Sequence, residues 1–314
     1  MPLSLRSRFY KALLRRIIKN RNLSLEQIRA GAGMVAMPTS ILPKGVSIMR
    51  DTIGGVPVDR VALADAEPGR IVMHLHGGGY VSGSPDTHRM LTSLLARTTR
   101  ATVLVPDYRL APEKPFPAAM DDTLAVYRSL LADGYEARNI AISGDSAGGG
   151  LALATVILLR ESRESLPAAL VCMSPWTDLM LEGASYTANA ASDAVLNVTS
   201  LREWAAFYAA GESLDNPLLS PARGEFDGFP PLLIQVCGDE MLLDDALVVA
   251  RKAEAAGVSV TLDIKNGLWH CWQLMGNLVP ENRETFAETG AFLRAHLGIG
   301  SVPGPRTGRL GQVS

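Results

Sequence analysis

The sequence has 314 residues, of which 47% are hydrophobic and 20% charged, an ordinary composition for a globular protein with a sizeable core. Thirty Lys and Arg side chains nearly balance 32 Asp and Glu, and the net charge of −2 argues against a nucleic-acid-binding protein. Three scattered cysteines are too few for a disulfide framework or a zinc cluster, and no apolar run reaches the roughly 20 residues that span a bilayer. We therefore expect a cytoplasmic globular protein with no metal, no nucleic-acid partner and no membrane association.

The first 25 residues carry seven basic side chains and no acidic one. Four apolar residues fall among them at roughly helical spacing: Phe9, Leu13, Ile17 and Ile18. Arg15 and Arg16 interrupt this stretch, which is therefore not typical of a signal peptide. We expect a helix that packs by its apolar stripe over a substrate pocket, and the alternative is an amphipathic helix lying on a membrane surface. Ser24 and Gln27 predict a capping box that begins a second short helix.

From residue 46 onward, short apolar segments alternate with segments long enough for helices. The expected strands are 46–50, 56–63, 70–74, 101–105, 139–143, 169–173, 232–237 and 258–264. Gly54 and Gly55 predict a hairpin between the first two. The clearest helical segments are 118–132, 147–163 and 242–256. The alternation predicts an α/β fold with a mostly parallel central sheet flanked by helices.

Residues 175–221 break the alternation, since they contain no clear strand and many small residues. We expect them to form one segment of an α-helical cap and residues 1–40 to supply its N-terminal helices. The main α/β domain is then 41–297. Residues 298–314 are rich in Gly and Pro, and we expect a flexible tail there.

One strand is followed by a motif that is typical of a catalytic serine. The strand 139–143 leads into Gly144-Asp-Ser146-Ala-Gly148, and a helical segment begins at once. In this context a G-x-S-x-G motif predicts a tight, strained turn that exposes the serine hydroxyl above the sheet. Small residues are needed at 144 and 148 because the strand and helix backbones pass close together. The alternative is a glycine-rich turn that caps the helix or holds a phosphate.

Three consecutive glycines upstream predict an oxyanion-binding loop. They follow the strand 70–74 in the run His76-Gly77-Gly78-Gly79. Backbone N–H groups that must point at a substrate oxygen with no side chain in the way would explain such a run. We expect the N–H groups of Gly78, Gly79 and Ala147 to be the donors. His76 and Gly77 would support the loop, with the His76 ring bracing it by hydrogen bonding.

A serine nucleophile needs a base, and the base needs an orienting carboxylate. His270 lies just beyond the last expected strand, the position at which this motif set places the base. Asp239 is the acid nearest the end of the strand 232–237 and is our first choice for the carboxylate. Asp244 is the alternative, and we expect Glu240 to support the loop.

Three segments together resemble the hormone-sensitive-lipase-like branch, bacterial family IV, of the α/β-hydrolase superfamily. They are His-Gly-Gly-Gly at 76–79, Asp-Tyr-Arg-Leu-Ala-Pro-Glu-Lys-Pro-Phe-Pro-Ala-Ala at 107–119 and Gly-Asp-Ser-Ala-Gly-Gly at 144–149. The resemblance runs from about residue 45 to residue 297. It implies an α/β-hydrolase fold with a helical cap, and a serine carboxylesterase without a cofactor that acts on short- to medium-chain esters through an acyl-enzyme. The catalytic residues that it implies are Ser146, Asp239 and His270.

The resemblance leaves several alternatives open. The segment 80–88 is similar to relatives that open lactones, and plant hormone receptors of this architecture bind small molecules without catalysis. A membrane-surface lipase and an amidase are further alternatives. The family often has Asp-Pro-Leu-x-Asp at the acid loop, where this chain has Asp239-Glu-Met-Leu-Leu-Asp244. Relatives often dimerise through an edge strand, here the one at 258–264.

We assign four side chains to the substrate pocket: Tyr80, Asp145, Trp176 and Trp269. Trp269 has packing in the core as an equal alternative. Cys271 adjoins the predicted base, and we expect it to be a packed structural thiol.

Overall fold

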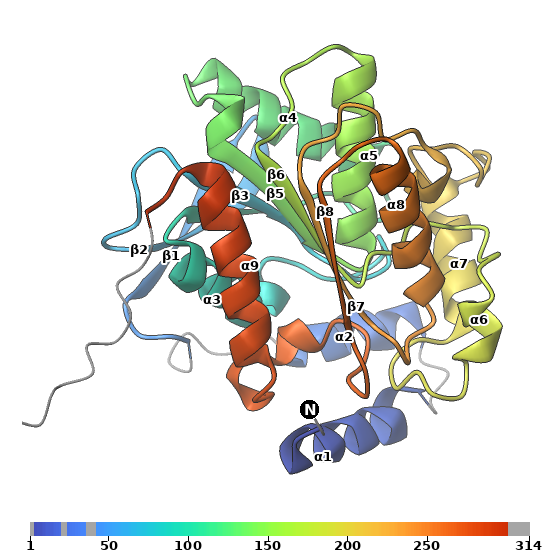
Figure 1. The fold of residues 1–314 in the computed structure, drawn as a ribbon. Coiled ribbons are helices and arrows are strands. Elements are labelled where there is room, and N and C mark those ends of the chain that lie inside the picture. Colours follow the sequence, from blue (N-terminus) through green and yellow to red (C-terminus); the bar gives the residue numbers. More distant parts are fainter. Residues whose placement is uncertain (1–2, 20–23, 36–41, 301–314) are drawn as a thin grey trace, which may run out of the picture.

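The computed structural model describes residues 3–19, 24–35 and 42–300. Eight strands form one sheet in the order β1-β2-β4-β3-β5-β6-β7-β8 (Figure 1). Their bounds are β1 Val46–Ile53, β2 Val56–Leu63, β3 Ile71–Leu75, β4 Thr102–Pro106, β5 Ile140–Asp145, β6 Ala169–Met173, β7 Leu232–Cys237 and β8 Val260–Lys265. Each strand lies within a few residues of its predicted position.

The sheet is antiparallel at one edge and parallel elsewhere. β1 and β2 form the predicted hairpin across Gly54 and Gly55, and β2 runs antiparallel to β4. The remaining neighbours pair in parallel. In the β3–β5 pair, Leu75 is opposite Gly144. This register places the residues that follow β3 beside the turn that follows β5.

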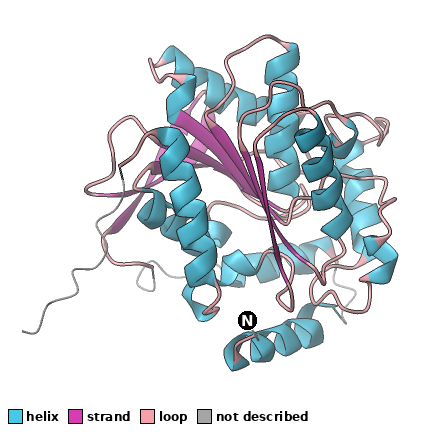
Figure 2. Cartoon of the chain, viewed as in Figure 1, coloured by secondary structure: helices cyan, strands magenta, loops and turns pink. Residues whose placement is uncertain are grey.

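Helices cover both faces of the sheet (Figure 2). The main helices are α3 Arg89–Thr99, α4 Ala118–Ala132, α5 Ala147–Glu161, α8 Leu243–Ala255 and α9 Asn282–Leu297. Alternate strand residues point to opposite faces, so Met73 packs in one apolar cluster with α4, α5 and α8, and Val72 packs in another with α3 and α9. The predicted α/β fold is confirmed. No helix in the described part of the chain is long and apolar enough to cross a membrane.

Four further helices are α1 Leu5–Leu14, α2 Leu25–Val35, α6 Ser185–Ala188 and α7 Val198–Ala209. A π-helical turn, Arg15–Lys19, extends α1. The capping box forms at the start of α2, where the Ser24 N–H donates to Gln27 Oε1 at 2.9 Å. Lys11 on α1 and Asn189 just after α6 donate to carbonyl oxygens of the loops that follow β8 and β7, respectively. These two helices thus lie at the carboxyl edge of the sheet. Residues 1–2, 20–23 and 36–40 of the predicted N-terminal cap segment, and 301–314 of the predicted tail, lie outside the described residues.

The apolar stripe of α1 faces outward. The exposed fraction is 81% for Leu5, 63% for Phe9, 38% for Leu13 and 42% for Ile17. The inner side of the helix is held largely by polar contacts, including a hydrogen bond from the buried Ser7 hydroxyl to Glu281. Our expectation that the stripe packs against the protein is therefore wrong. Spacing defines an apolar face of a helix but does not determine which way that face points.

Candidate active site

Ser146 occupies the strained turn that the motif predicts. It lies between β5 and α5 with φ 53° and ψ −123°, a conformation that non-glycine residues rarely adopt. A Cβ atom at Gly144 would overlap the Gly148 carbonyl, and one at Gly148 would overlap the Leu75 carbonyl. The close approach of strand and helix is thus the reason why both positions require glycine. The predicted need for small residues is confirmed.

His270 is in hydrogen-bonding contact with the Ser146 hydroxyl. The distance from His270 Nε2 to Ser146 Oγ is 3.0 Å. His270 comes from the loop after β8 and is nearly buried, whereas Ser146 is partly exposed. This contact is the one that a base requires in order to accept the proton of a nucleophilic hydroxyl.

The carboxylate against His270 belongs to Glu240. Glu240 Oε1 lies 3.0 Å from His270 Nδ1. Its other oxygen accepts hydrogen bonds from the Ser174 hydroxyl at 2.8 Å and from the Cys237 N–H at 3.0 Å. Ser174 also accepts a bond from the Cys271 N–H at 3.2 Å, so one hydroxyl links the acid loop to the histidine loop. Glu240 is fully buried and held on both oxygens.

Asp239 points away from the histidine. Its carboxylate pairs with Lys11 of α1 at 2.7 Å, and its side chain is 35% exposed. Asp244, the alternative, accepts a bond from the Ser185 N–H at 2.9 Å. The predicted contact between Asp239 and His270 is therefore wrong. β7 ends at Cys237 and the chain turns at 238–240, which directs residue 239 outward and the longer side chain of residue 240 back beneath the histidine.

The surroundings of His270 affect its pKa in two opposing ways. Burial lowers the pKa, but the Glu240 carboxylate raises it, and the net pKa lies above the ordinary value. Cys271 Sγ lies 3.4 Å from His270 Nε2, and burial holds the pKa of this thiol well above its usual range. Because the thiolate is the reactive form of cysteine, the raised pKa supports the structural assignment of Cys271.

The glycine loop lies beside the turn at Ser146. Gly78 and Gly79 have φ values of 121° and 64°, which favour glycine. In the described part of the chain, neither N–H group donates to a protein acceptor. Ala147 is the first residue of α5, where the N–H has no partner within the helix. All three N–H groups are therefore available to a substrate oxygen.

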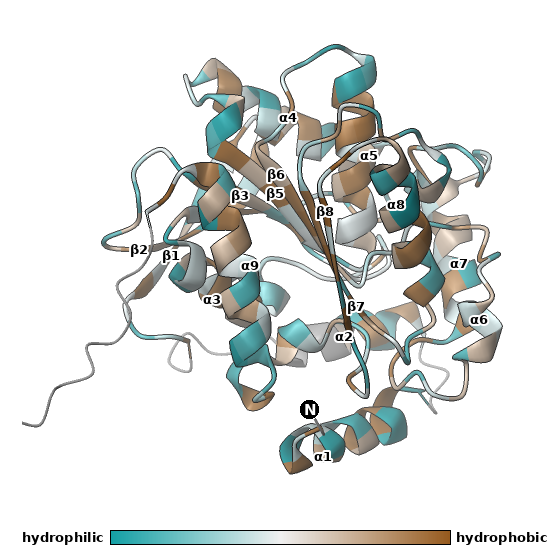
Figure 3. Ribbon diagram, viewed as in Figure 1, coloured by the Kyte–Doolittle hydropathy of each residue, from teal (hydrophilic) through white to brown (hydrophobic). Residues whose placement is uncertain are grey.

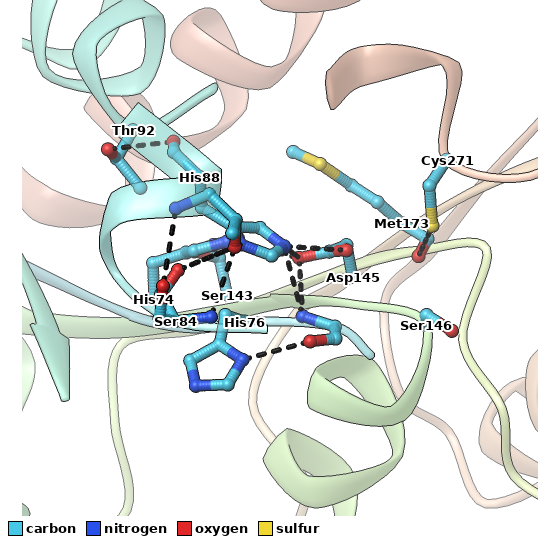
Figure 4. Close-up of polar contacts among 12 residues, drawn as sticks. His74, His76, Ser84, His88, Thr92, Ser143, Asp145, Ser146, Met173 and Cys271 are labelled. Atoms are coloured by element: carbon cyan, nitrogen blue, oxygen red, sulfur yellow. Dashed lines mark hydrogen bonds and ion pairs between the residues drawn. The ribbon is translucent and has the colours of Figure 1, made fainter. Parts of the chain in front are cut away.

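A buried polar cluster holds this loop from behind (Figure 4). Asp145 accepts a hydrogen bond from the Gly77 N–H at 3.1 Å and pairs with His88 and His74, each at 3.2 Å. Burial by itself would raise the pKa of the Asp145 carboxyl, but His88 and His74 hold this pKa well below its usual range. Burial lowers the His88 pKa, yet Asp145 raises it above the ordinary value overall. Asp145 and His88 thus together fix the first glycine of the loop.

His76 braces the same loop. Its Nδ1 lies 2.9 Å from the Gly77 carbonyl oxygen, and its ring stacks on Tyr108 with centroids 4.0 Å apart. The Tyr108 hydroxyl donates to the His76 carbonyl at 2.5 Å. Burial lowers the pKa of His76 to about 3, which keeps its ring neutral at physiological pH. The predicted bracing contact is confirmed.

The four side chains assigned to the substrate pocket are almost completely buried. Tyr80 stacks on Tyr208 of α7, Trp176 has no exposed surface, and Trp269 packs in the cluster beneath α1. Asp145 belongs to the cluster behind the glycine loop. All four therefore present almost no surface to a substrate.

Sequence reasoning missed three contributors to the site. The sequence predicts only loop support for Glu240 and gives no signal for Ser174 or for Trp204 of α7. The Trp204 ring lies where a side chain on Gly79 would project. Within the described ranges, no group of His, Cys, Asp or Glu side chains could hold a metal ion.

Comparison with known proteins agrees with this geometry. A family model described as the alpha/beta hydrolase fold matches residues 72–274. An acetyl-hydrolase of Streptomyces hygroscopicus is 45% identical over 249 residues, 79% of this chain and 83% of the relative. An esterase of Acinetobacter venetianus is 38% identical over 230 residues, 73% of this chain and 76% of the relative. A solved esterase of the bacterial hormone-sensitive lipase family matches with a TM-score of 0.90 and 40% identity, over 95% of this chain and 100% of that chain.

The chain therefore belongs to the alpha/beta hydrolase fold family. Within that family it is a serine carboxylesterase, similar to the esterases of the hormone-sensitive lipase branch. The resemblance seen in the sequence is confirmed, and the alternative of a non-catalytic binding module is not supported.

Proposed function

We propose that Ser146, His270 and Glu240 form the catalytic triad of this esterase. The observation that carries the proposal is the continuous chain of two contacts, each 3.0 Å long, from the serine hydroxyl through the imidazole to the carboxylate. The buried carboxylate would hold the imidazole in the tautomer that leaves Nε2 free to accept the serine proton. It would also stabilise the imidazolium that forms.

The reaction proceeds by two acyl transfers. His270 takes the proton of Ser146, whose Oγ attacks the ester carbonyl carbon, and the carbonyl electron pair moves to oxygen. The N–H groups of Gly78, Gly79 and Ala147 bind this oxyanion. The carbon–oxygen bond to the alcohol then breaks, and the alcohol leaves with the proton from His270. Water repeats the sequence on the acyl-enzyme and releases the acid and the free serine.

We propose that the acyl group is short. The relative from Streptomyces hygroscopicus is named an acetyl-hydrolase. The partly buried Trp204 ring packs against Gly79, one of the expected oxyanion donors, and therefore occupies space close to the reacting carbonyl. A bulky aromatic wall at this place favours acetyl and other short acyl groups over long chains.

Hydrolysis of p-nitrophenyl esters from acetate to palmitate tests the triad and the acyl preference together. We expect turnover to be highest on the shortest esters, and Ser146→Ala to reduce kcat by at least about 10³-fold. Glu240→Gln and Asp239→Asn form a matched pair, of which only the first should impair kcat strongly. A larger loss in the Asp239 variant would overturn the assignment of the acid. A simple lactone assayed beside the esters tests the lactonase alternative.

We also propose a cytoplasmic location and a homodimer. The three free, buried thiols at Cys172, Cys237 and Cys271 are consistent with a reducing compartment. In the described residues β8 pairs only with β7, so its other edge is available to a second copy. Cell fractionation and the mass of the protein in solution test these two proposals.

A further inference from the structure

The outer face of the N-terminal helix exposes a continuous apolar stripe. Leu5, Phe9, Leu13 and Ile17 follow one another at intervals of four residues along α1 and the π-helical turn that extends it. All four are exposed, Leu5 and Phe9 by more than half of their surface. A surface helix normally turns its apolar stripe toward the protein. The outward orientation of this stripe therefore indicates that it contacts an apolar or interfacial partner outside this chain.

Polar contacts on the inner face hold the helix in this orientation. The Ser7 hydroxyl donates to Glu281, and Lys11 Nζ contacts Asp239 at 2.7 Å and the Gly267 carbonyl at 3.0 Å. Arg15 and Lys19 donate to the carbonyls of Ala191 and Leu196. Leu3, Tyr10 and Leu14 pack on the apolar cluster that contains Trp269. The outward orientation of the stripe is thus fixed by contacts along both the helix and its extension.

Basic side chains surround the stripe. Helical geometry places Arg8 on one side of it and Arg6 on the other, and Arg16 near its end. The three are exposed, and none forms an ion pair within the described part of the chain. The first 25 residues contain no acidic side chain. An apolar stripe with arginines on both sides matches an anionic bilayer, where the apolar residues enter the headgroup region and the guanidinium groups meet phosphates.

We propose that the outer face of α1 binds the surface of an anionic lipid bilayer. A symmetric pairing of two such helices would bring the exposed arginines of both copies together, which disfavours a second copy of the chain as the partner. Because α1 lies at the carboxyl edge of the sheet (Figures 1 and 3), binding would place that edge, and with it the active site, near the membrane. This proposal replaces our sequence-based expectation of no membrane association.

Cosedimentation of the full-length protein with vesicles tests the proposal. The vesicles are phosphatidylcholine alone or phosphatidylcholine with about one third phosphatidylglycerol. We expect binding to the anionic vesicles, at least tenfold weaker binding to the neutral ones, and loss of binding as salt is raised. Leu5→Ser with Phe9→Ser, and separately Arg6→Glu with Arg8→Glu, should each weaken binding to anionic vesicles at least tenfold.

Two matched controls separate this face from general surface effects. Met49→Ser removes an apolar side chain that is 58% exposed on β1, and Arg97→Glu reverses an exposed charge on α3. Both should bind vesicles like the unchanged protein, and circular dichroism checks that every variant is folded. Absence of binding, or equal weakening by the control variants, would overturn the proposal. A dimer that Phe9→Ser dissociates, without vesicle binding, would show that a second copy covers the face instead.

Discussion

Asp239 and Glu240 are adjacent in the chain, yet their carboxylates serve different partners. Asp239 pairs with Lys11 near the surface, while Glu240 is buried against His270 and accepts bonds on both oxygens. A buried carboxylate that is hydrogen-bonded on both oxygens keeps one orientation. The histidine is therefore positioned by a residue whose longer side chain spans the distance from the turn after β7.

The pH dependence of the esterase follows from the His270–Glu240 pair. Only neutral imidazole accepts the serine proton, so kcat/KM should rise with pH through the pKa of His270. Glu240 raises this pKa above the ordinary histidine value against the effect of burial. The acid limb of the pH profile should therefore lie at a correspondingly high pH. Glu240→Gln removes the largest of the influences that oppose burial, so the limb should move to lower pH while the plateau rate falls by roughly 10²–10⁴. Profiles of kcat/KM from pH 5 to 9 measure both effects.

An unshifted limb in the Glu240 variant would contradict this account of the histidine. Asp239→Asn is the control, because its carboxylate pairs with Lys11 and does not contact the imidazole. Its acid limb should coincide with that of the unchanged enzyme.

A second residue-scale prediction concerns Asp145, which positions the glycine loop without reaching the substrate. Asp145→Asn keeps one oxygen that can accept from the Gly77 N–H but removes the charge that pairs with His88. We expect kcat to fall about tenfold with little change in KM. A less firmly held loop weakens the binding of the oxyanion more than it weakens the binding of the ground-state ester. Inhibition by a trifluoromethyl ketone, which forms a tetrahedral adduct, should weaken in parallel.

Asp122→Asn on α4 is the matched control for Asp145, since it removes a carboxylate that pairs with Arg109 and lies outside the glycine loop. If the Asp145 variant changed KM instead, or lost stability without a change in kcat, the positioning role would be refuted.

At the scale of elements, the insertion after β6 brings α7 over the glycine loop. Tyr208 of α7 stacks on Tyr80 with centroids 3.7 Å apart, and Trp204 lies against Gly79. The helix is therefore packed on the loop that carries the proposed oxyanion donors. Changes on α7 should affect which acyl groups fit rather than the chemistry itself.

Trp204→Ala tests the role of α7 in acyl selection. Removal of the indole opens space beside Gly79, so we expect kcat/KM on butyrate and hexanoate esters to rise several-fold relative to acetate. The measurement is the ratio of kcat/KM values across the p-nitrophenyl series. Phe207→Ala on the same helix is the comparison, because this side chain is likewise partly buried in the same cluster. An unchanged ratio in the Trp204 variant would exclude the ring from the acyl pocket.

Elements with local signals could be predicted from the sequence, whereas the orientation of side chains between elements could not. The strained turn at Ser146 and the glycine loop after β3 are encoded by contiguous residues, so the position of each can be predicted from the sequence. The choice between Asp239 and Glu240 depends on one turn and on its contacts with Ser174 and Lys11, which come from distant parts of the chain. The outward apolar stripe of α1 was missed for the same reason.

At the scale of the whole molecule, a buried acid couples stability to pH. Asp245 at the start of α8 accepts backbone N–H groups of Thr177 at 2.6 Å and Asp178 at 2.8 Å on one oxygen. These bonds fix the beginning of the segment that leads from β6 to the insertion. Its other oxygen has no hydrogen-bond partner within the described residues, and burial raises the pKa of the carboxyl to about 7.

The raised pKa of Asp245 makes the stability of the folded protein depend on pH. In the unfolded chain Asp245 titrates near its ordinary value, so between about pH 4 and pH 7 the folded state binds the additional proton. The contribution of Asp245 to the free energy of unfolding is complete below that window. It is lost as pH rises through the window, at up to about 1.4 kcal/mol per pH unit. Asp245→Asn removes the titration, while its carbonyl oxygen can still accept both N–H bonds and its amide replaces the unpartnered oxygen.

We therefore expect the free energy of unfolding of Asp245→Asn, relative to the unchanged protein, to increase as pH rises from 4 to 7 and then to level off. Urea unfolding at a series of pH values measures this difference, which cancels the contributions of all other titrating groups. Asp227→Asn, at an exposed position, should show no such trend. A difference that stays flat across the window would mean that Asp245 is ionised throughout, held by the N–H groups of Thr177 and Asp178 in spite of its burial.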